Sequence, residues 1–219
     1  MSTSVKICGL STPETVAVAL EAGADMIGLV FFEKSPRHVG LETARALAAQ
    51  ARHRAEVVAL TVDAADATLE AILRRVGPDY FQLHGRESPQ RVAEIQQKYG
   101  VSVIKAIGVA EAADLAQADA YAEADALLID AKPPKGALLP GGNGVAFDWR
   151  LARDFHPRKP WLLSGGLTPE NVTQAIGLSL ARSVDVSSGV ESAPGAKDAE
   201  KIRAFIEAAR AGFAAVEQE

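Results

Sequence analysis

The sequence has one cysteine, few aromatic residues and no long apolar run. Because Cys8 is the only thiol in 219 residues, an intramolecular disulfide is excluded and nothing in the chain requires an oxidising compartment. The longest strongly apolar run, residues 26–32, is far shorter than the ~20 residues that a membrane-spanning helix needs. No basic stretch followed by an apolar one opens the sequence, so we expect no signal peptide and a cytoplasmic location.

The chain also lacks an excess of basic residues. Lys and Arg number 23 against 28 Asp and Glu, which gives a net charge of −5. We therefore expect no nucleic-acid partner and no membrane surface, and an anionic substrate would need cations gathered locally. The hydrophobic fraction of 48% is enough for one substantial core. Since no linker or low-complexity segment is visible, we expect residues 1–219 to form a single domain.

What the chain does contain is a regular alternation of short apolar runs and segments with helical spacing. Strands are predicted near residues 5–8, 26–32, 57–62, 80–83, 101–107, 126–129, 161–163 and 184–186. Eight strand-helix units of about 27 residues each are a lean version of the ~250-residue eight-stranded barrel. This pattern predicts an α/β protein with the (β/α)8 TIM-barrel fold; the alternative architecture is an open, doubly wound parallel sheet.

Small-residue turns end the last two predicted strands. They are formed by Gly165 and Gly166, and by Ser187, Ser188 and Gly189. Glycine leaves backbone N–H groups unobstructed, and Thr168 with Pro169 predicts a helix start whose positive dipole end would favour an anion. Either turn alone could be a tight connection. Together they predict a phosphate site, because barrel enzymes commonly bind phosphate after strands seven and eight.

Reactive side chains fall at the same ends of the predicted strands, where barrel enzymes carry their active sites. They are Cys8, Arg37, His84, Asp130 and Asp185. A lone cysteine is more often a buried apolar residue, but a place at a strand exit favours a functional thiol whose pKa Lys6 could lower. Asp130 follows a dry apolar run, so it could be held protonated as an acid or could cap a loop.

The remaining candidates each have two interpretations. Arg37 could grip a carboxylate through two hydrogen bonds or only be solvated at the surface. His84 could donate to an anionic ring, or be a core histidine satisfied by backbone. Asp185 could bind a sugar hydroxyl or orient the Ser187 turn. The Pro-, Gly- and Lys-rich loop 131–145 exceeds a plain connection, which predicts a lid or binding loop, with a disordered spacer as the alternative.

Taken in order, these segments resemble the phosphoribosylanthranilate isomerase family from end to end. The resemblance is carried by residues 5–9 (VKICG), 28–32 (GLVFF), 35–37 (SPR), 82–85 (QLHG), 128–130 (LID), 141–144 (GGNG), 147–149 (FDW), 164–167 (SGGL) and 185–190 (DVSSGV). Asn143 stands where the family often has Ser or Thr, and Asn is also compatible with a turn.

The resemblance implies an Amadori rearrangement in tryptophan biosynthesis, from the aminoaldose phosphoribosylanthranilate to an aminoketose. It implies that Asp130 protonates the ring oxygen as general acid and that Cys8 removes a sugar proton as general base. Arg37 would hold the anthranilate carboxylate and the two turns the phosphate, with His84 and Asp185 also in the substrate site. The only expected partner is this small anionic substrate, with no metal or organic cofactor. The sequence leaves a monomer and a homodimer equally open.

Other function classes fit parts of the pattern. An indole-glycerol-phosphate synthase would carry a lysine and glutamates at strand ends, and a related isomerase of histidine biosynthesis would use aspartates as both acid and base. Another sugar-phosphate isomerase on the same barrel is a further possibility. A noncatalytic phosphate-binding barrel would keep its function after Cys8→Ala, whereas an enzyme that uses this thiol would lose it.

Overall fold

The parallel strands close into a barrel in the order in which they follow one another along the chain, β1 pairing with β8. The computed structural model describes residues 3–133, 136, 139–142, 144 and 146–217. Its barrel strands are β1 (Ser4–Cys8), β2 (Met26–Phe31), β3 (Glu56–Thr61), β4 (Tyr80–Leu83), β5 (Ser102–Val109), β6 (Ala126–Ala131), β7 (Trp161–Leu163) and β8 (Ser183–Val186). The predicted barrel is confirmed, and the open sheet is excluded.

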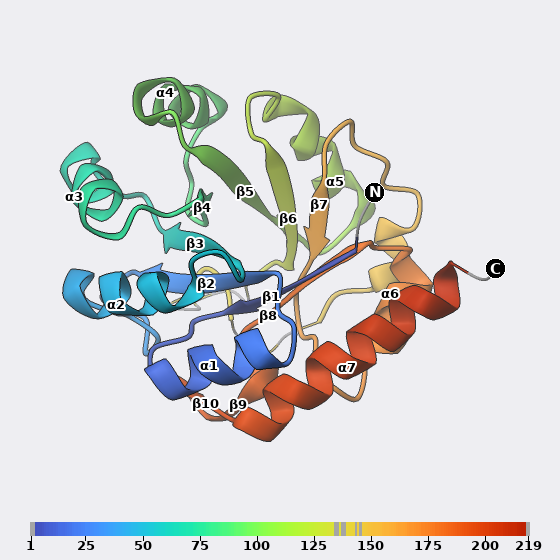
Figure 1. Cartoon of the computed structure of the whole chain (residues 1–219). Helices are drawn as coiled ribbons and strands as arrows, with labels where there is room; N and C mark the ends of the chain where they lie inside the picture. Colours follow the sequence, from blue (N-terminus) through green and yellow to red (C-terminus); the bar gives the residue numbers. More distant parts are fainter. Residues whose placement is uncertain (1–2, 134–135, 137–138, 143, 145, 218–219) are drawn as a thin grey trace.

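Helices surround the ring of strands (Figure 1). They are α1 (Pro13–Glu21), α2 (Leu41–Ala51), α3 (Asp66–Val76), α4 (Pro89–Tyr99), α5 (Ala112–Leu115), α6 (Val172–Ser179) and α7 (Ala199–Val216), with 3-10 turns η1 (Ala116–Ala120), η2 (Trp149–Ala152) and η3 (Ser188–Val190). Thr12 and Ser88 cap α1 and α4 with their hydroxyl groups, and a proline follows each cap. Among the described residues no helix is long and apolar enough to cross a membrane.

One predicted helix begins later than expected, and the helical segment before β6 is short. That segment is α5 followed by η1, in which Leu115 and Ala118 are the buried apolar residues. The helix expected to start at Thr168 starts at Val172 instead. Asn171 accepts a hydrogen bond from the Thr168 N–H (2.8 Å) and donates to the Gly166 carbonyl (2.9 Å), so a turn replaces the first helical turn.

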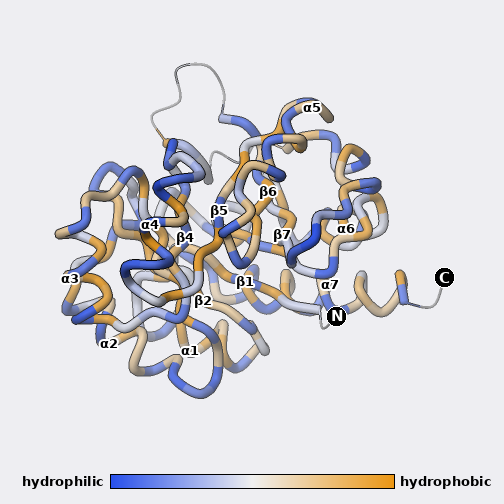
Figure 2. Tube along the Cα trace, turned by 90° about the horizontal axis from the view of Figure 1, so that it is seen from above, coloured by the Kyte–Doolittle hydropathy of each residue, from blue (hydrophilic) through white to orange (hydrophobic). Residues whose placement is uncertain are grey.

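Apolar side chains fill the space between the strands and the helices, and also the part of the barrel interior near the strand starts. Figure 2 shows the strands mostly in orange and the hydrophilic segments mostly in the outer helices and loops. The interior cluster consists of Val58, Ile104, Ala126, Leu128 and Leu162. Further along the strands, buried inward positions are polar, as at Lys6, Gln82 and Asp185. The interior therefore changes from apolar to polar toward the carboxyl ends of the strands.

Aspartates at the opposite end of the barrel fasten the starts of the strands. Asp25, Asp79 and Asp125 accept hydrogen bonds from the N–H groups of Val5, Val57 and Val103, each at 2.7 Å. Each aspartate precedes an even-numbered strand and holds the start of the odd-numbered strand before it.

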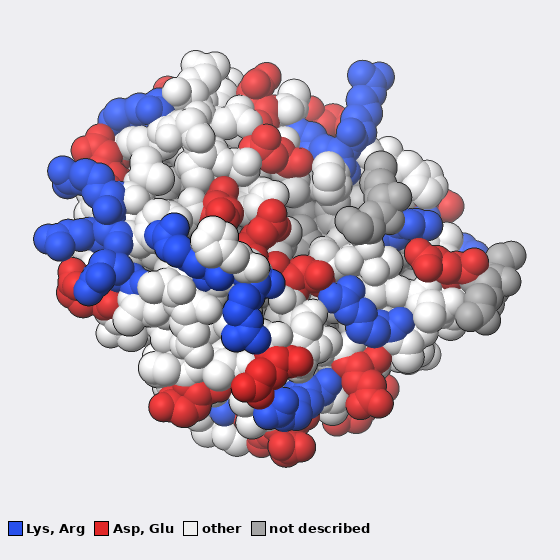
Figure 3. All heavy atoms as spheres, in the orientation of Figure 1, with Lys and Arg blue, Asp and Glu red and all other residues white. Residues whose placement is uncertain are grey.

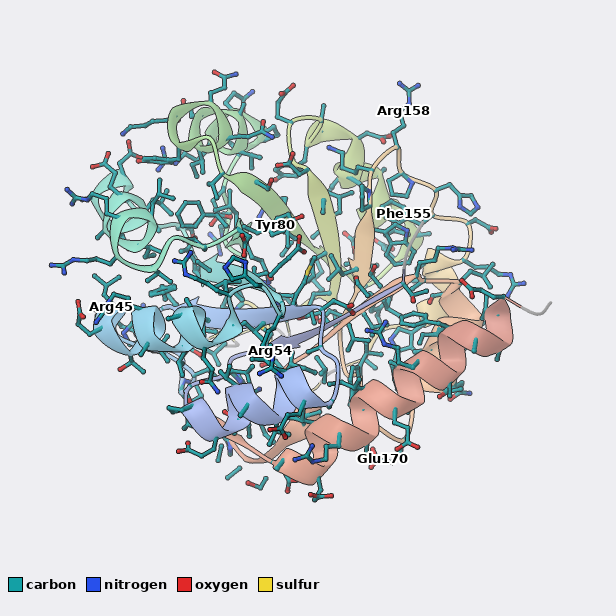
Figure 4. The ribbon with its side chains drawn as sticks, viewed as in Figure 1. Arg45, Arg54, Tyr80, Phe155, Arg158 and Glu170 are labelled. Carbon is teal, nitrogen blue, oxygen red and sulfur yellow. The ribbon has the colours of Figure 1, made fainter. Side chains whose placement is uncertain are left out.

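Tyr80, labelled in Figure 4, lines an open depression at this end of the barrel. Burial together with the Glu56 carboxylate raises the pKa of Tyr80.

We expect Asp79→Ala to lower the free energy of unfolding by about 1 kcal/mol, because the Val57 N–H loses its charged acceptor. Urea denaturation measures this change. Asp119→Ala is the control, since Asp119 is exposed, and it should change stability by less than about 0.5 kcal/mol. Equal effects of the two substitutions would show that the hydrogen bond contributes nothing.

Candidate active site

The carboxyl ends of the strands open into a cavity that gathers nearly all predicted site residues. It encloses about 800 Å³, open space at its mouth included. Its lining includes Cys8, Arg37, His84, Asp130, Gly165, Gly166, Asp185, Ser187 and Ser188. Gly189 is not among the described residues that line the cavity. This glycine lies behind the turn, where a Cβ would come within 3.2 Å of the Thr168 Cα, so it lets the two turns pack together.

Cys8 ends β1 with its thiol inside the barrel and is only 3% exposed. It pairs with Gly28 of β2, where a Cβ would lie 2.8 Å from the Cys8 Sγ, so the glycine leaves room for the thiol. Lys6, two residues earlier on the same face of the strand, is fully buried, and its Nζ donates to Asp185 Oδ1 at 2.6 Å. The thiol thus lies next to a buried ion pair.

Burial raises the pKa of the Cys8 thiol above its ordinary value. The charges of Lys6 and Lys197 oppose this rise, and the Asp185 carboxylate adds to it. Burial alone would lower the pKa of Lys6, but the Asp185 carboxylate and the Cys8 thiol together raise it, so Lys6 stays protonated. The thiol pKa is therefore not brought toward neutrality: Lys6 does lower it, as expected, but burial and the Asp185 carboxylate raise it by more.

Asp130 lies within β6 and is 7% exposed. Its Oδ1 accepts a hydrogen bond from the Ala131 N–H at 2.8 Å, and its Oδ2 lies 3.3 Å from the Nε2 of His84. The Nδ1 of His84 lies 2.9 Å from the amide nitrogen of Gln82. The two ring nitrogens of His84 therefore face the Gln82 amide on one side and the Asp130 carboxyl on the other. The partners of the imidazole are side chains, so His84 is not a core histidine satisfied by backbone.

Arg37 is buried rather than solvated, at 6% exposure. Its Nε and Nη2 donate to the two carboxylate oxygens of Glu191 at 2.7 and 2.9 Å. Its aliphatic stem covers Gly9, where a Cβ would lie 2.7 Å from the Arg37 Cδ. One edge of the guanidinium is therefore already occupied, and a ligand carboxylate would have to approach the Nη1 side.

On the face of the molecule shown in Figure 3, charges of both signs are interspersed.

The two small-residue turns have the geometry that glycine permits. Gly165 and Gly166 have φ values of +86° and +67°, and a Cβ on Gly165 would lie 2.7 Å from the Ala131 nitrogen. Both carboxylate oxygens of Asp185 accept hydrogen bonds from protein groups: Oδ1 accepts from the Lys6 Nζ, and Oδ2 accepts from the Ser164 hydroxyl at 3.3 Å. These contacts hold Lys6 and Ser164, and neither of them reaches the Ser187 turn that Asp185 was expected to orient.

The described part of the 131–145 loop lies over the cavity. A Cβ on Gly141 would lie 2.8 Å from Asp130 Oδ2, and one on Gly142 would lie 2.8 Å from the Arg37 Nη1. The loop thus contacts the carboxyl at one side of the cavity and the guanidinium at another, as expected for a binding loop. Asn143, together with residues 134–135, 137–138 and 145, lies outside the described residues.

Sequence reasoning missed Glu191 and Lys197, which hold Arg37 and the Ser187 turn. Arg37 and Glu191 are 154 residues apart, so no local pattern could pair them. Gln82 could have been found, because it shares the inward face of its strand with His84, two residues on. No group of three or more His, Cys, Asp or Glu side chains that could hold a metal occurs in the part of the chain that the structure describes.

The closed barrel and the cavity at the carboxyl ends of its strands define a (β/α)8-barrel enzyme. The model of one family, N-(5'-phosphoribosyl)anthranilate (PRA) isomerase, matches residues 5–208. The chain belongs to this family, and it is an isomerase of tryptophan biosynthesis.

Individual relatives agree along nearly the full chain. The N-(5'-phosphoribosyl)anthranilate isomerase of Rhodopseudomonas palustris strain BisA53 is 60% identical over 212 residues, 96% of this chain and 97% of the relative. The structure of the Thermotoga maritima isomerase matches with a TM-score of 0.86 and 36% identity, over 95% of this chain and 99% of that one; that isomerase is dimeric. A further structure, of a phosphoribosyl anthranilate isomerase in complex with reduced 1-(o-carboxyphenylamino)-1-deoxyribulose 5-phosphate, matches over the same shares with a TM-score of 0.82 and 34% identity.

We expect Gly141→Ala to lower turnover at least about tenfold, because the added methyl group would displace the Asp130 or the His84 side chain. Steady-state kinetics measure the effect. Gly136→Ala is the control in the same loop, since a Cβ there would meet no described atom within 4 Å although Gly136 has a φ of +84°. If both variants lose activity equally, the contact with the carboxyl is not the cause.

Proposed function

We propose that Asp130 is the general acid and Cys8 the general base of the Amadori rearrangement of N-(5'-phosphoribosyl)anthranilate. The observation that carries this proposal is that the only thiol of the chain and the buried carboxyl of β6 line one cavity. They come from strands β1 and β6, which are three steps apart around the barrel. A sugar ring between them can therefore be attacked from two directions.

Ring opening is the step that needs an acid. Asp130 donates its proton to the furanose ring oxygen, the bond from C1' to that oxygen breaks, and the nitrogen lone pair forms a C=N double bond. The carboxylate that remains is stabilised by the Ala131 N–H, which already donates to Oδ1, and it faces the His84 imidazole, whose Nε2 lies 3.3 Å from Oδ2. His84 acts here through Asp130.

Proton removal is the step that needs a base. The Cys8 thiolate takes the proton from C2', and the electron pair of that bond moves toward the positively charged nitrogen and gives an enolamine. Loss of the hydroxyl proton at C2' and protonation at C1' then yield the ketone. The Lys6 ammonium stabilises the thiolate, while Asp185 keeps Lys6 in place. Each positioned proton transfer contributes roughly 10² to 10⁴ in rate, and the substrate nitrogen accepts the electrons without a cofactor.

The two anionic ends of the substrate hold the ribose between acid and base. The Nη1 side of Arg37 binds the anthranilate carboxylate, and the turns at Gly165, Gly166, Ser187 and Ser188 bind the phosphate. Support comes from the isomerase solved with a reduced product analogue, a molecule with a carboxyl group at one end and a phosphate at the other. Fixing both ends turns the proton transfers into reactions of groups already in position.

We expect Cys8→Ala and Asp130→Asn each to lower turnover at least about a hundredfold, because each removes one proton-transfer group. A fluorescence assay of substrate turnover measures this loss, and thermal unfolding checks that both variants fold. Asp119→Asn makes the same chemical change at an exposed site and should keep full activity.

Binding of the reduced product analogue by Asp130→Asn separates chemistry from binding. The variant should retain the analogue, because Arg37 and the two turns hold its ends. Loss of binding in parallel with turnover would contradict the acid role of Asp130, and near-normal turnover of Cys8→Ala would contradict the base role of the thiol.

A further inference from the structure

A short hairpin follows the last strand of the barrel and is absent from the strand-helix pattern. It consists of β9 (Glu191–Ala193) and β10 (Ala196–Lys197), paired antiparallel outside the barrel sheet. In Figure 1 it lies at the lower edge of the molecule, near α1 and the start of α7. Its charged side chains, Glu191 and Lys197, are buried, and no step of the rearrangement uses them.

Glu191 holds Arg37 from outside the cavity. The two side chains form a bidentate ion pair with distances of 2.7 and 2.9 Å, and both are almost fully buried. Burial alone would raise the pKa of Glu191, but the Arg37 hydrogen bonds and the Lys197 charge hold that pKa below its ordinary value. Glu191 is therefore an anion at neutral pH, and the paired donors fix the plane of the guanidinium.

The turn of the hairpin also contacts the backbone of the loop that carries Arg37. Gly195 has a φ of +82°, and a Cβ there would lie 2.5 Å from the Pro36 carbonyl oxygen and 3.3 Å from the Pro36 Cβ. The Gly195 N–H also donates to Glu191 Oε2 at 3.2 Å. Both the residue before Arg37 and the guanidinium of Arg37 are therefore in contact with the hairpin.

Lys197 connects the hairpin to the other end of the site. Its Nζ donates to Glu191 Oε1 and to the Ser187 carbonyl, each at 2.8 Å, and to the Ser187 hydroxyl at 3.3 Å. Burial lowers the pKa of Lys197, and the Glu191 carboxylate opposes this effect. A continuous chain of contacts thus runs from the Ser187 turn through Lys197 and Glu191 to Arg37.

We propose that the β9–β10 hairpin is a specificity element, in which Glu191 and Gly195 position Arg37 for the substrate carboxylate and Lys197 ties that position to the Ser187 turn. These three residues are positioning residues, since none is among the described residues that line the cavity. A guanidinium held in one place selects a ligand with a carboxyl group at the matching distance from the phosphate. The proposal rests on the carboxylate-binding role of Arg37.

The test compares two ligands that differ only in the carboxyl group. They are reduced 1-(o-carboxyphenylamino)-1-deoxyribulose 5-phosphate and the same compound made with aniline in place of anthranilate. Calorimetry gives the Kd of each ligand, and the ratio of the two Kd values measures selectivity for the carboxyl group. Arg37→Ala and Glu191→Gln should each reduce this ratio at least about tenfold, and the double variant should reduce it no further.

The outcomes separate the two proposals. If Arg37→Ala leaves the ratio unchanged, Arg37 does not bind the carboxylate, and the hairpin proposal loses its premise. If Arg37→Ala abolishes the selectivity while Glu191→Gln keeps it, only the hairpin proposal fails. Equal weakening of both ligands by Glu191→Gln would indicate a merely structural role and would also overturn the proposal.

Gly195→Ala is a second variant that leaves every buried charge in place. It should reduce the ratio several-fold, because the methyl group pushes against Pro36 and moves Arg37. Gly100→Ala is the matched control, since Gly100 also has a left-handed φ, +61°, but a Cβ there would meet no described atom within 4 Å. A Gly195→Ala protein with the selectivity of Gly100→Ala would overturn the proposal even if Glu191→Gln did not fold.

Discussion

The buried ion pair between Lys6 and Asp185 is the constraint on which the rest of the site depends. The two residues are register partners on β1 and β8, the pair of strands that closes the barrel. On one side of this pair the interior is filled by apolar side chains, and on the other the cavity opens. Removing either partner would leave an uncompensated buried charge, at a cost of about 3 to 5 kcal/mol. The strand pair that closes the barrel therefore also places a buried ammonium group, that of Lys6, beside the Cys8 thiol.

The same arrangement occurs twice in the site, each time with a carboxylate that holds a cation in place. Asp185 keeps Lys6 beside the thiol, and Glu191 keeps Arg37 beside the binding loop. In both pairs the carboxylate fixes the position of the cation and also offsets part of its positive charge. The cation therefore attracts a nearby anion less strongly than an unpaired cation would. Burial is the main reason that the Cys8 pKa rises although an ammonium group lies next to the thiol, and the Asp185 carboxylate adds to the rise.

The sequence was sufficient for the barrel and for the set of residues at its carboxyl end, because parallel strands bring their ends to one rim whatever the loops do. It was insufficient where a side chain competes with the backbone, as at Asn171, which replaces the first turn of the expected helix. It also could not predict the direction of the Cys8 pKa shift, which depends on burial by distant segments. Glu191 and Lys197 lie in a short hairpin that the alternation of apolar and polar residues in the sequence does not predict.

The state of the Cys8 thiol is the most direct test of this account. Because the chain has one cysteine, cysteine labelled with carbon-13 at Cβ gives a single NMR signal that follows ionisation of the thiol with pH. In the ligand-free protein, the account predicts a pKa above the ordinary value of a thiol, and a still higher pKa in Lys6→Met, where Asp185 faces the thiolate unpaired. A pKa at or below the ordinary value, or one that Lys6→Met leaves unchanged, would contradict it.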